Sequence, residues 1–385
     1  MYLKREKFCP YCRFFYKNRQ RVATFADMTK QIFKYMNEAH VMLHASSSHT
    51  TQEQIAELQS SLNNIQSEEG LSDMTPVFIR YFLSDAANQL PLLRELGHKF
   101  QCATSVVEQP PLDGTKIAAW VYLMSGVTVD ALDNGYYKVS ESQYTHILRA
   151  SSATPDIEDS EDQTYQLLSD YAQWLRNYGM TLKDNCVRTW FFVHDIDINY
   201  KGVVTGRNSL FAKEGLTATT HFIASTGIGG SSDNHKTKVL MDTFAINGIG
   251  KNDMGYLYAK SHLNPTYEYG VAFERGAYVD FHDKRRIYIS GTASIDNKGN
   301  ILHPGDVSRQ ALRMLENVEM LLSEGSMTYD NVGHMIVYLR DIADYNIINE
   351  LFQNRFPHKP YVIVLAPVCR PGWLIEMECM AVKQL

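Results

Sequence analysis

The sequence predicts an α+β protein built from two tandem two-layer modules, each a mixed sheet with helices on one face. Two stretches, which begin at Gln163 and Gln310, share the same order of features: an amphipathic helix, a glycine, a Met-Thr pair, an Asp-Asn pair and an apolar strand closed by Asp-Ile. Such a recurring order indicates an internal repeat. The chain has 385 residues, of which 44% are hydrophobic, so it is long enough to bury two cores.

The second copy has the element order β-β-α-β-α-β-β. Strands are predicted at 277–281 and 285–290, and the helix that follows begins after Asp306 and ends at Gly325, which suit an N-cap and a stop. Its apolar residues recur at helical spacing, so we expect it to cover a sheet. The remaining elements are a strand, a helix and two strands, at 334–339, 345–352, 361–366 and 374–382.

The first copy is expected to follow the same plan with insertions between its parts. The chain then divides into an N-terminal extension (1–24), a first module with insertions (25–247) and a second module (248–385). One insertion, 51–64, has the pattern of a polar surface helix. The elements predicted for the first module are strands at 77–83 and 116–124, a helix at 161–178, a strand at 187–194, a helix at 200–213 and strands at 219–225 and 238–246.

Composition and charge exclude several classes of function. The net charge is −6 and no basic groove is evident, so we expect no nucleic-acid partner. The sequence has no signal peptide and no long apolar run, which predicts a cytoplasmic protein without a membrane segment. Cys9 and Cys12 form a C-x-x-C pair without the second pair of a zinc ribbon, so no metal site is predicted.

The last predicted strand carries two carboxylates on one face. Glu376 and Glu378 alternate with apolar residues, so both point to the same side of the strand, about 7 Å apart. One interpretation is a pair of ion-paired residues at a subunit boundary. The other is a general acid, because a carboxyl among apolar neighbours keeps its proton to higher pH. Near the equivalent positions the first copy has Met241 and Thr243 and lacks the acid.

Three arginines are candidates to bind an anion. Arg370 lies in the Cys-Arg-Pro-Gly segment just before the last strand, Arg275 closes an aromatic stretch that includes Tyr269, and Arg207 lies beside a predicted helix. Each also has a structural interpretation, as a solvated loop residue, an arginine stacked on aromatic rings, or a salt-bridged surface residue.

The C-terminal module resembles the Rid/YjgF family through SGTASID (290–296), VYLRDIADY and the closing IEMEC strand. The span 76–382 is similar to the chorismatases, which join a degenerate Rid-like half to an active one. The supporting segments are EQPPLDG, RTWFFVHDID, ASTGIGG, NPTYEYGVAFERG and CRPGWLIEME, in this order. The resemblance implies two tandem Rid/YjgF-like modules of the chorismate-mutase-like, two-layer type.

It also implies an enzyme that releases pyruvate from chorismate. Glu376 matches the family's catalytic acid, and Cys369 matches the cysteine of the subgroup that forms 3-hydroxybenzoate instead of a dihydrodiol acid. The substrate is a dianionic small molecule, and no metal or organic cofactor is implied. A homotrimer and a monomer are both tenable assemblies. The residues expected to bind substrate are Arg207, Arg275, Arg370, Tyr269, Tyr361 and Glu378.

Two other functions stay open. Single-domain Rid proteins hydrolyse reactive enamines and imines and hold the substrate carboxylate with an arginine on the penultimate strand. Tyr361 occupies that position here, and Thr219 or Thr220 occupies it in the first copy, so the expected arginine is missing twice. The second alternative is a non-catalytic protein that binds a small molecule.

Overall fold

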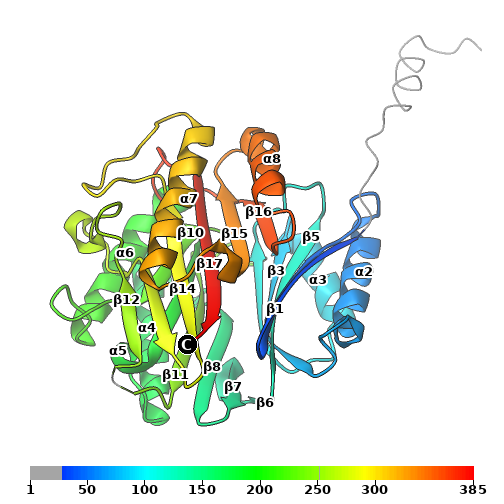
Figure 1. The fold of residues 1–385 in the computed structure, drawn as a ribbon, viewed down its shortest axis with the longest axis horizontal. Coiled ribbons are helices and arrows are strands. Elements are labelled where there is room, and N and C mark those ends of the chain that lie inside the picture. Colours follow the sequence, from blue (N-terminus) through cyan, green and yellow to red (C-terminus); the bar gives the residue numbers. More distant parts are fainter. Residues whose placement is uncertain (1–27, 251) are drawn as a thin grey trace, which may run out of the picture.

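Three mixed β-sheets, each covered by helices on one face, form the part of the chain that the computed structural model describes, residues 28–250 and 252–385 (Figure 1). The predicted α+β class with mixed sheets in tandem two-layer modules is confirmed. The Cys9 and Cys12 pair and the predicted extension 1–24 lie outside the described residues.

The first sheet is built by residues 29–125. Its helices are α2 (Thr51–Asn63) and α3 (Ala86–Leu96), and α2 begins with a capping box in which Thr50 and Glu53 bond reciprocally. Ile55, Leu58 and Leu62 of α2 are fully buried against the sheet. The strand order is β1 (Thr29–Tyr35), β2 (Glu38–His44), β5 (Ile117–Ser125), β3 (Met74–Leu83) and β4 (Ala103–Glu108).

The second sheet has six strands and belongs to residues 127–247. Helices α4 (Ser160–Asn177) and α6 (Ile196–Lys213) pack together as its cover, and a single turn, α5 (Leu182–Asn185), precedes β9. The strand order is β10 (Ala224–Gly229), β9 (Cys186–Val193), β11 (Val239–Asn247), β8 (Tyr144–Ser152), β7 (Tyr136–Glu141) and β6 (Val127–Ala131).

The third sheet follows the sequence prediction closely. Helix α7 (Val307–Glu324) begins at the predicted N-cap Asp306 and buries its apolar stripe, and α8 (Tyr345–Arg355) follows β15. The strand order is β12 (Met254–Leu257), β13 (Gly276–Asp280), β14 (Lys284–Ala293), β17 (Ile375–Gln384), β15 (Val332–Leu339) and β16 (Tyr361–Leu365).

The three sheets share one topology. If the outer strands β6 and β12 are set aside, each module reads β-β-α-β-α-β-β, its third and fourth strands are parallel, and its last strand inserts antiparallel between the second and the third. Strand β4 packs on β8, β10 on β14, and β15 on β2, so each module touches both others. The chain therefore closes a ring of three equivalent modules.

The sequence did not predict this number of sheets. Residues 25–247, which we expected to form one module with insertions, carry two sheets, and the expected surface helix 51–64 is a core helix of the first. Strands 77–83 and 116–124 belong to that first sheet. The hairpin that leads into α4 is β7 and β8, whose two-residue turn has a left-handed residue at Ser142 (φ 53°). No glycine or asparagine marks this turn, so the pattern was missed.

The inner faces of the three sheets meet around buried charges. Arg80 of the first module pairs with Asp242 of the second at 2.9 Å and with Glu378 of the third at 3.4 Å. A second cluster joins Arg286 and Lys284 to Glu38 and Glu141. Because removing one partner would leave a buried charge unpaired, these contacts fix the modules in one arrangement. No helix in the described ranges is long and apolar enough to cross a bilayer.

Candidate active site

A cavity lies where the second module meets the third. Strand β10 and helix α6 contribute one wall, and β14 and the start of β17 contribute the opposite wall. The segment between β12 and β13, which includes the short helix Thr266–Tyr269, closes the cavity with Tyr269 and Phe273. Six residues singled out from the sequence line this one space: Arg207, Tyr269, Arg275, Cys369, Arg370 and Glu376.

Glu376 is buried in the wall of the cavity. It stands near the start of β17, between Ala293 of β14 and Tyr338 of β15, and it is 5% exposed. Among the described residues no ion pair engages its carboxylate, whereas Glu378 two positions later binds two arginines. The carboxyl group of Glu376 is therefore available to a ligand.

The pKa of Glu376 is raised to about 8. Burial is the largest cause and the neighbouring charge of Glu378 adds to it, while Arg275 and Arg188 act in the opposite direction. The dominant cause is the loss of hydration, which penalises the charged carboxylate. At neutral pH the side chain therefore carries a proton. A carboxylic acid of this kind can donate that proton to a substrate atom.

Arg207 points two unpartnered donors into the same region. The residue is 1% exposed, and its Nε and Nη2 atoms have no hydrogen-bond partner in the described part of the chain. Burial lowers the pKa of Arg207, but guanidinium groups stay charged in proteins. A buried cation with free donors is unfavourable by itself, and a carboxylate from a ligand would satisfy it.

Two further arginines lie on the opposite side of the cavity. Arg275 is held by the backbone and side-chain oxygens of Asn264, at 3.0 to 3.2 Å. The guanidinium carbon of Arg370 lies 4.5 Å from the ring centre of Tyr269 and 4.8 Å from that of Trp373. Such contacts with aromatic rings use the face of the guanidinium group, so its N–H donors can still bind an anion.

Cys369 completes the wall next to Tyr200. Burial raises the pKa of its thiol to about 12, and the proximity of Glu376 contributes, so the sulfur is a neutral thiol and not a thiolate nucleophile. Tyr200 and Arg207 lie seven residues apart on α6 and so share one helix face. In the described ranges no group of three histidine, cysteine or acidic residues is arranged to hold a metal ion.

Comparisons with known proteins agree with this architecture. Residues 272–383 match the family model described as Endoribonuclease L-PSP. A RutC family protein of Saccharolobus solfataricus is 32% identical over 99 residues, which cover 25% of this chain and 79% of the relative. The chain belongs to the RutC family. The 3-aminoacrylate deaminase RutC of Acinetobacter baylyi is 30% identical over 97 residues, covering 25% of this chain and 77% of that protein.

The sequence similarity to RutC proteins covers one module, whereas the similarity to one solved structure covers most of the chain. The crystal structure of a chorismatase superposes with a TM-score of 0.64 over 80% of this chain and 93% of that one, at 20% identity. The predicted membership of the Rid/YjgF superfamily and the likeness to chorismatases are confirmed at the level of the fold.

Two residues that we expected to bind substrate lie elsewhere in this RutC-family chain. Glu378 accepts from Arg188 Nη2 at 2.7 Å and from Trp190 Nε1 at 2.8 Å in the centre of the ring, so it is already saturated. Tyr361 lines a different cavity, between the third and first modules, where its carbonyl oxygen contacts His44. The equivalent of Tyr361 in the second module is Ser225, not Thr219 or Thr220, because β10 starts at Ala224.

The sequence left several lining residues unassigned. Tyr200, Ser225, Gly291 and Trp373 all contact the cavity of the RutC-family chain, but none was named as a site residue. The seven-residue spacing of Tyr200 and Arg207 on a predicted helix was a usable signal for the first. The small residues of β10 form a strand whose short side chains leave room for the cavity.

The cavity is small and has a larger neighbour. Its volume is about 40 Å³, well below that of sites that enclose a drug-sized ligand. A second space of about 260 Å³ lies on the far side of Phe273 and Arg275, whose side chains line both. The cavity in this structure is therefore smaller than a ring-sized ligand.

Proposed function

We propose that this protein is a chorismatase-like enzyme that releases pyruvate from chorismate, with Glu376 as the general acid. The supporting observation is a buried carboxyl with a pKa near 8 in the same cavity as Arg207, whose buried donors lack partners. Chorismate offers what these groups need, because it combines two carboxylates with an acid-sensitive enol ether. Arg207, Arg275 and Arg370 are proposed to bind the two carboxylates.

The proposed reaction begins with proton transfer from Glu376 to the methylene carbon of the enolpyruvyl group. The electron pair of the double bond forms the new C–H bond, and positive charge develops on the ether carbon and is shared with its oxygen. Glu376 is 5% exposed, so the transfer occurs in a region of low dielectric. The carboxylate that remains can then stabilise the positive charge, since it lies in the same cavity.

The ether can then be cleaved in two ways. In the aromatising route the bond between ring carbon C3 and the ether oxygen breaks, and that oxygen leaves within pyruvate. The hydroxyl oxygen on C4 bonds to C3 and its bond to C4 then breaks, the ring loses the proton of C3, and Glu376 regains a proton. In the hydrolytic route a water molecule adds and the ring product is a dihydrodiol acid. We favour the aromatising route to 3-hydroxybenzoate, because Cys369 is a neutral thiol in a dry wall and offers water a poor binding position.

The alternative is a Rid-type enamine or imine deaminase. It is supported by the similarity to a protein named 3-aminoacrylate deaminase over a single module. Against it, the strand position expected to carry the carboxylate-binding arginine holds Ser225 in the wall of the Glu376 cavity and Tyr361 in the third module. A small enamine would also leave two of the three arginines without an anion.

One experiment separates these functions. Purified full-length protein is incubated with chorismate and, in parallel, with 2-aminoacrylate generated in place. Pyruvate with an equal amount of hydroxybenzoate from chorismate is the expected result. Accelerated ammonia release from 2-aminoacrylate alone would support the deaminase instead, and no product from either substrate would support a non-catalytic binding protein.

We also propose that a single chain is the functional unit. A homotrimer of single-module chains would bring three modules together, whereas this chain by itself already contains three in a closed ring. Light scattering of the purified protein is expected to give the mass of one chain. A cytoplasmic location remains our prediction, in keeping with the four free cysteines of the described region.

A further inference from the structure

The three modules create three equivalent junctions, and each junction carries a cavity. Thr104, Ser225 and Tyr361 stand at the same register position of β4, β10 and β16, and each lines the cavity of its own junction. The cavity between the first and second modules is therefore the structural counterpart of the Glu376 cavity. Nothing in the proposed reaction uses it.

This counterpart cannot carry out acid chemistry. By strand register the equivalent of Glu376 in β11 is Leu240, opposite Phe192, and the equivalent of Glu378 is Asp242, opposite Trp190. The sequence alignment that set Met241 and Thr243 at these positions was displaced by one residue. Since Leu240 lines the junction cavity, the acid is replaced there by an apolar wall. A ligand in this junction would be bound without being transformed.

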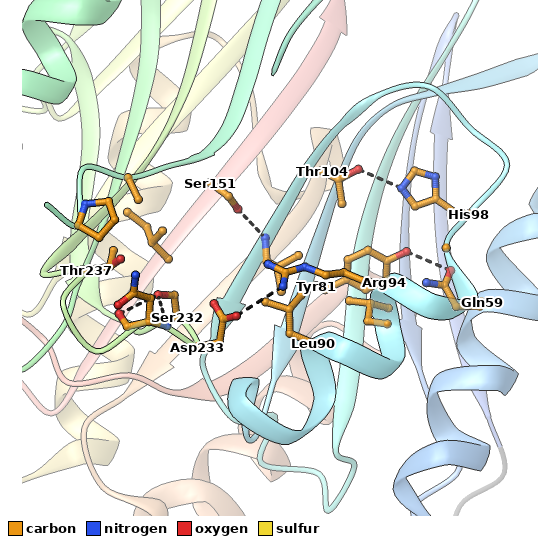
Figure 2. Close-up of a pocket in the computed structure, with 17 residues that line it drawn as sticks. Gln59, Tyr81, Leu90, Arg94, His98, Thr104, Ser151, Ser232, Asp233 and Thr237 are labelled. Atoms are coloured by element: carbon orange, nitrogen blue, oxygen red, sulfur yellow. Dashed lines mark hydrogen bonds and ion pairs between the residues drawn. The ribbon is translucent and has the colours of Figure 1, made fainter. Parts of the chain in front are cut away.

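The junction cavity has the size and the walls of a small-molecule site. Its volume is about 500 Å³, within the range of such pockets. Leu90, Leu93 and Val106 of the first module and Leu240 of the second line it, which gives it an apolar part. Figure 2 shows Leu90 and Tyr81 among the lining residues, and a dashed line joins Arg94 to Asp233.

Gln59 supplies a hydrogen-bond donor inside this interior. The residue is 3% exposed, and its amide oxygen accepts from the hydroxyl of Tyr81 at 3.2 Å. Its amide nitrogen has no partner among the described residues (Figure 2). A buried donor left unpaired costs free energy, so an acceptor atom on a ligand would be favoured there.

The mouth of the cavity offers one charge of each sign. Arg94 of the first module lies 3.6 Å from Asp233 of the second, and their side chains are 67% and 34% exposed. Such an exposed pair is weak, so a ligand can replace it with two better contacts. Burial lowers the pKa of the nearby His98, which therefore adds no positive charge at neutral pH. A dianion is disfavoured at this mouth, whereas a zwitterion matches it.

We propose that the junction of the first and second modules is a non-catalytic binding site for an aromatic α-amino acid. The α-carboxylate would pair with Arg94 and the α-ammonium group with Asp233, and the ring would lie among Leu90, Val106 and Leu240. The amide nitrogen of Gln59 favours a ring that ends in an acceptor, so tyrosine should bind more tightly than phenylalanine. This proposal does not depend on the reaction at Glu376, because it concerns a separate cavity.

Calorimetric titration of the full-length protein tests the proposal. L-Phenylalanine and L-tyrosine are expected to bind, while 3-phenylpropanoate and phenethylamine, which each lack one charge, should bind at least about tenfold more weakly. Arg94→Gln should weaken phenylalanine binding by about tenfold, and Arg309→Gln, an equally exposed change on α7, should leave it unchanged.

Four results would overturn the proposal, three from titration and one from competition. One is the absence of any binding heat with either amino acid, and another is equal binding by Arg94→Gln and the unmodified protein. The third is tight binding of 3-phenylpropanoate, which would assign the site to aromatic monocarboxylates. Competition is a further check, because chorismate should not displace phenylalanine if the two cavities are separate, and displacement would contradict the assignment.

Discussion

Gly291 lies directly against the carboxyl group of Glu376: a Cβ atom added at position 291 would stand 2.2 Å from its Oε1 atom. The backbone of β14 at Gly291 therefore packs directly against the carboxyl group of Glu376. The amide of Gly291 also donates to the Thr226 hydroxyl at 2.9 Å, which ties this backbone to the second module. The position of the acid thus depends on two modules at once.

Gly291→Ala is expected to displace the acid without unfolding the protein. The new methyl group would push the carboxyl group away from its position, and a misplaced acid loses rate, here by about ten- to a hundredfold in kcat. Glu376→Asp shortens the side chain and makes room. The fold-loss in kcat of the double variant should therefore be smaller than the product of the fold-losses of the two single variants. A double variant whose loss equals that product would contradict the contact between residues 291 and 376.

Glu376→Gln is expected to remove turnover and keep the fold. The amide has the shape of the protonated acid but no proton of comparable acidity, so pyruvate release should fall by about 10²- to 10⁴-fold. The folded state should be kept, and the thermal midpoint at pH 7 should rise, because the unmodified protein must take up a proton at Glu376 when it folds and the amide variant need not. An unaltered rate of pyruvate release would remove Glu376 from the mechanism.

Activity should be lost at alkaline pH. The pKa of Glu376 is raised to about 8 from an ordinary value of 4.5, so the proton-bearing form is present below pH 8, and kcat should fall tenfold per unit above it. Between pH 4.5 and 8 the folded state holds a proton that the unfolded state has released. This group's contribution to stability is therefore fully present below pH 4.5 and declines as the pH rises to 8.

Two measurements check that activity and stability both decline as the pH rises. The pH profile of pyruvate release should show its alkaline limb near pH 8, and Glu376→Gln should remove from urea unfolding the part of the pH dependence that falls between pH 4.5 and 8. A decline in pyruvate release that begins below pH 6 would mean that Glu376 ionises near its ordinary pKa and that its carboxyl group is hydrated.

Arg207→Met should stabilise the protein while it weakens substrate binding. The buried guanidinium leaves two donors unpaired, and methionine would replace it with apolar packing beside Phe191 and Phe273. We expect the free energy of unfolding to rise by about 1–3 kcal/mol and KM for chorismate to rise by about tenfold or more. Arg309→Met, at a side chain that is 71% exposed, is the control and should change neither. If Arg207→Met instead lowered the free energy of unfolding, Arg207 would have a structural role.

The local sequence pattern predicted the helices and strands of the third module well and those of the first module poorly. Helix α7 has an N-cap, a wide apolar stripe and a terminal glycine, so its limits could be predicted. In the first module β1 is polar and half exposed, and α3 contains Pro91, which argues against a helix. These elements are stabilised by packing on β3 and β5, which no local pattern records.

The same limit applies to the candidate site. Strand alternation correctly set Glu376 and Glu378 on one face, but it could not tell which of the two meets an arginine. The deciding partners, Arg80 and Arg188, are 298 and 190 residues away from Glu378 in the sequence. They approach it only because three modules share one centre. Tyr361 was misassigned for a related reason, since equivalent strand positions face three different cavities.

Glu378→Gln should change both the stability of the ring and the acidity of Glu376. Removing this carboxylate leaves the buried guanidinium of Arg188 without its main ion pair, while Arg80 keeps Asp242, so unfolding should become easier by about 3–5 kcal/mol. The charge of Glu378 also raises the pKa of Glu376, so its loss should move the alkaline limb of the pH profile to lower pH.

Asp242→Asn is the control that separates the effect on stability from the effect on the pKa of Glu376. That variant removes the shorter of the two ion pairs of Arg80 but lies in another strand, so it should lower stability without moving the alkaline limb. If Glu378→Gln left the limb in place, the two carboxylates of β17 would be electrostatically independent, and burial alone would have to hold the proton on Glu376.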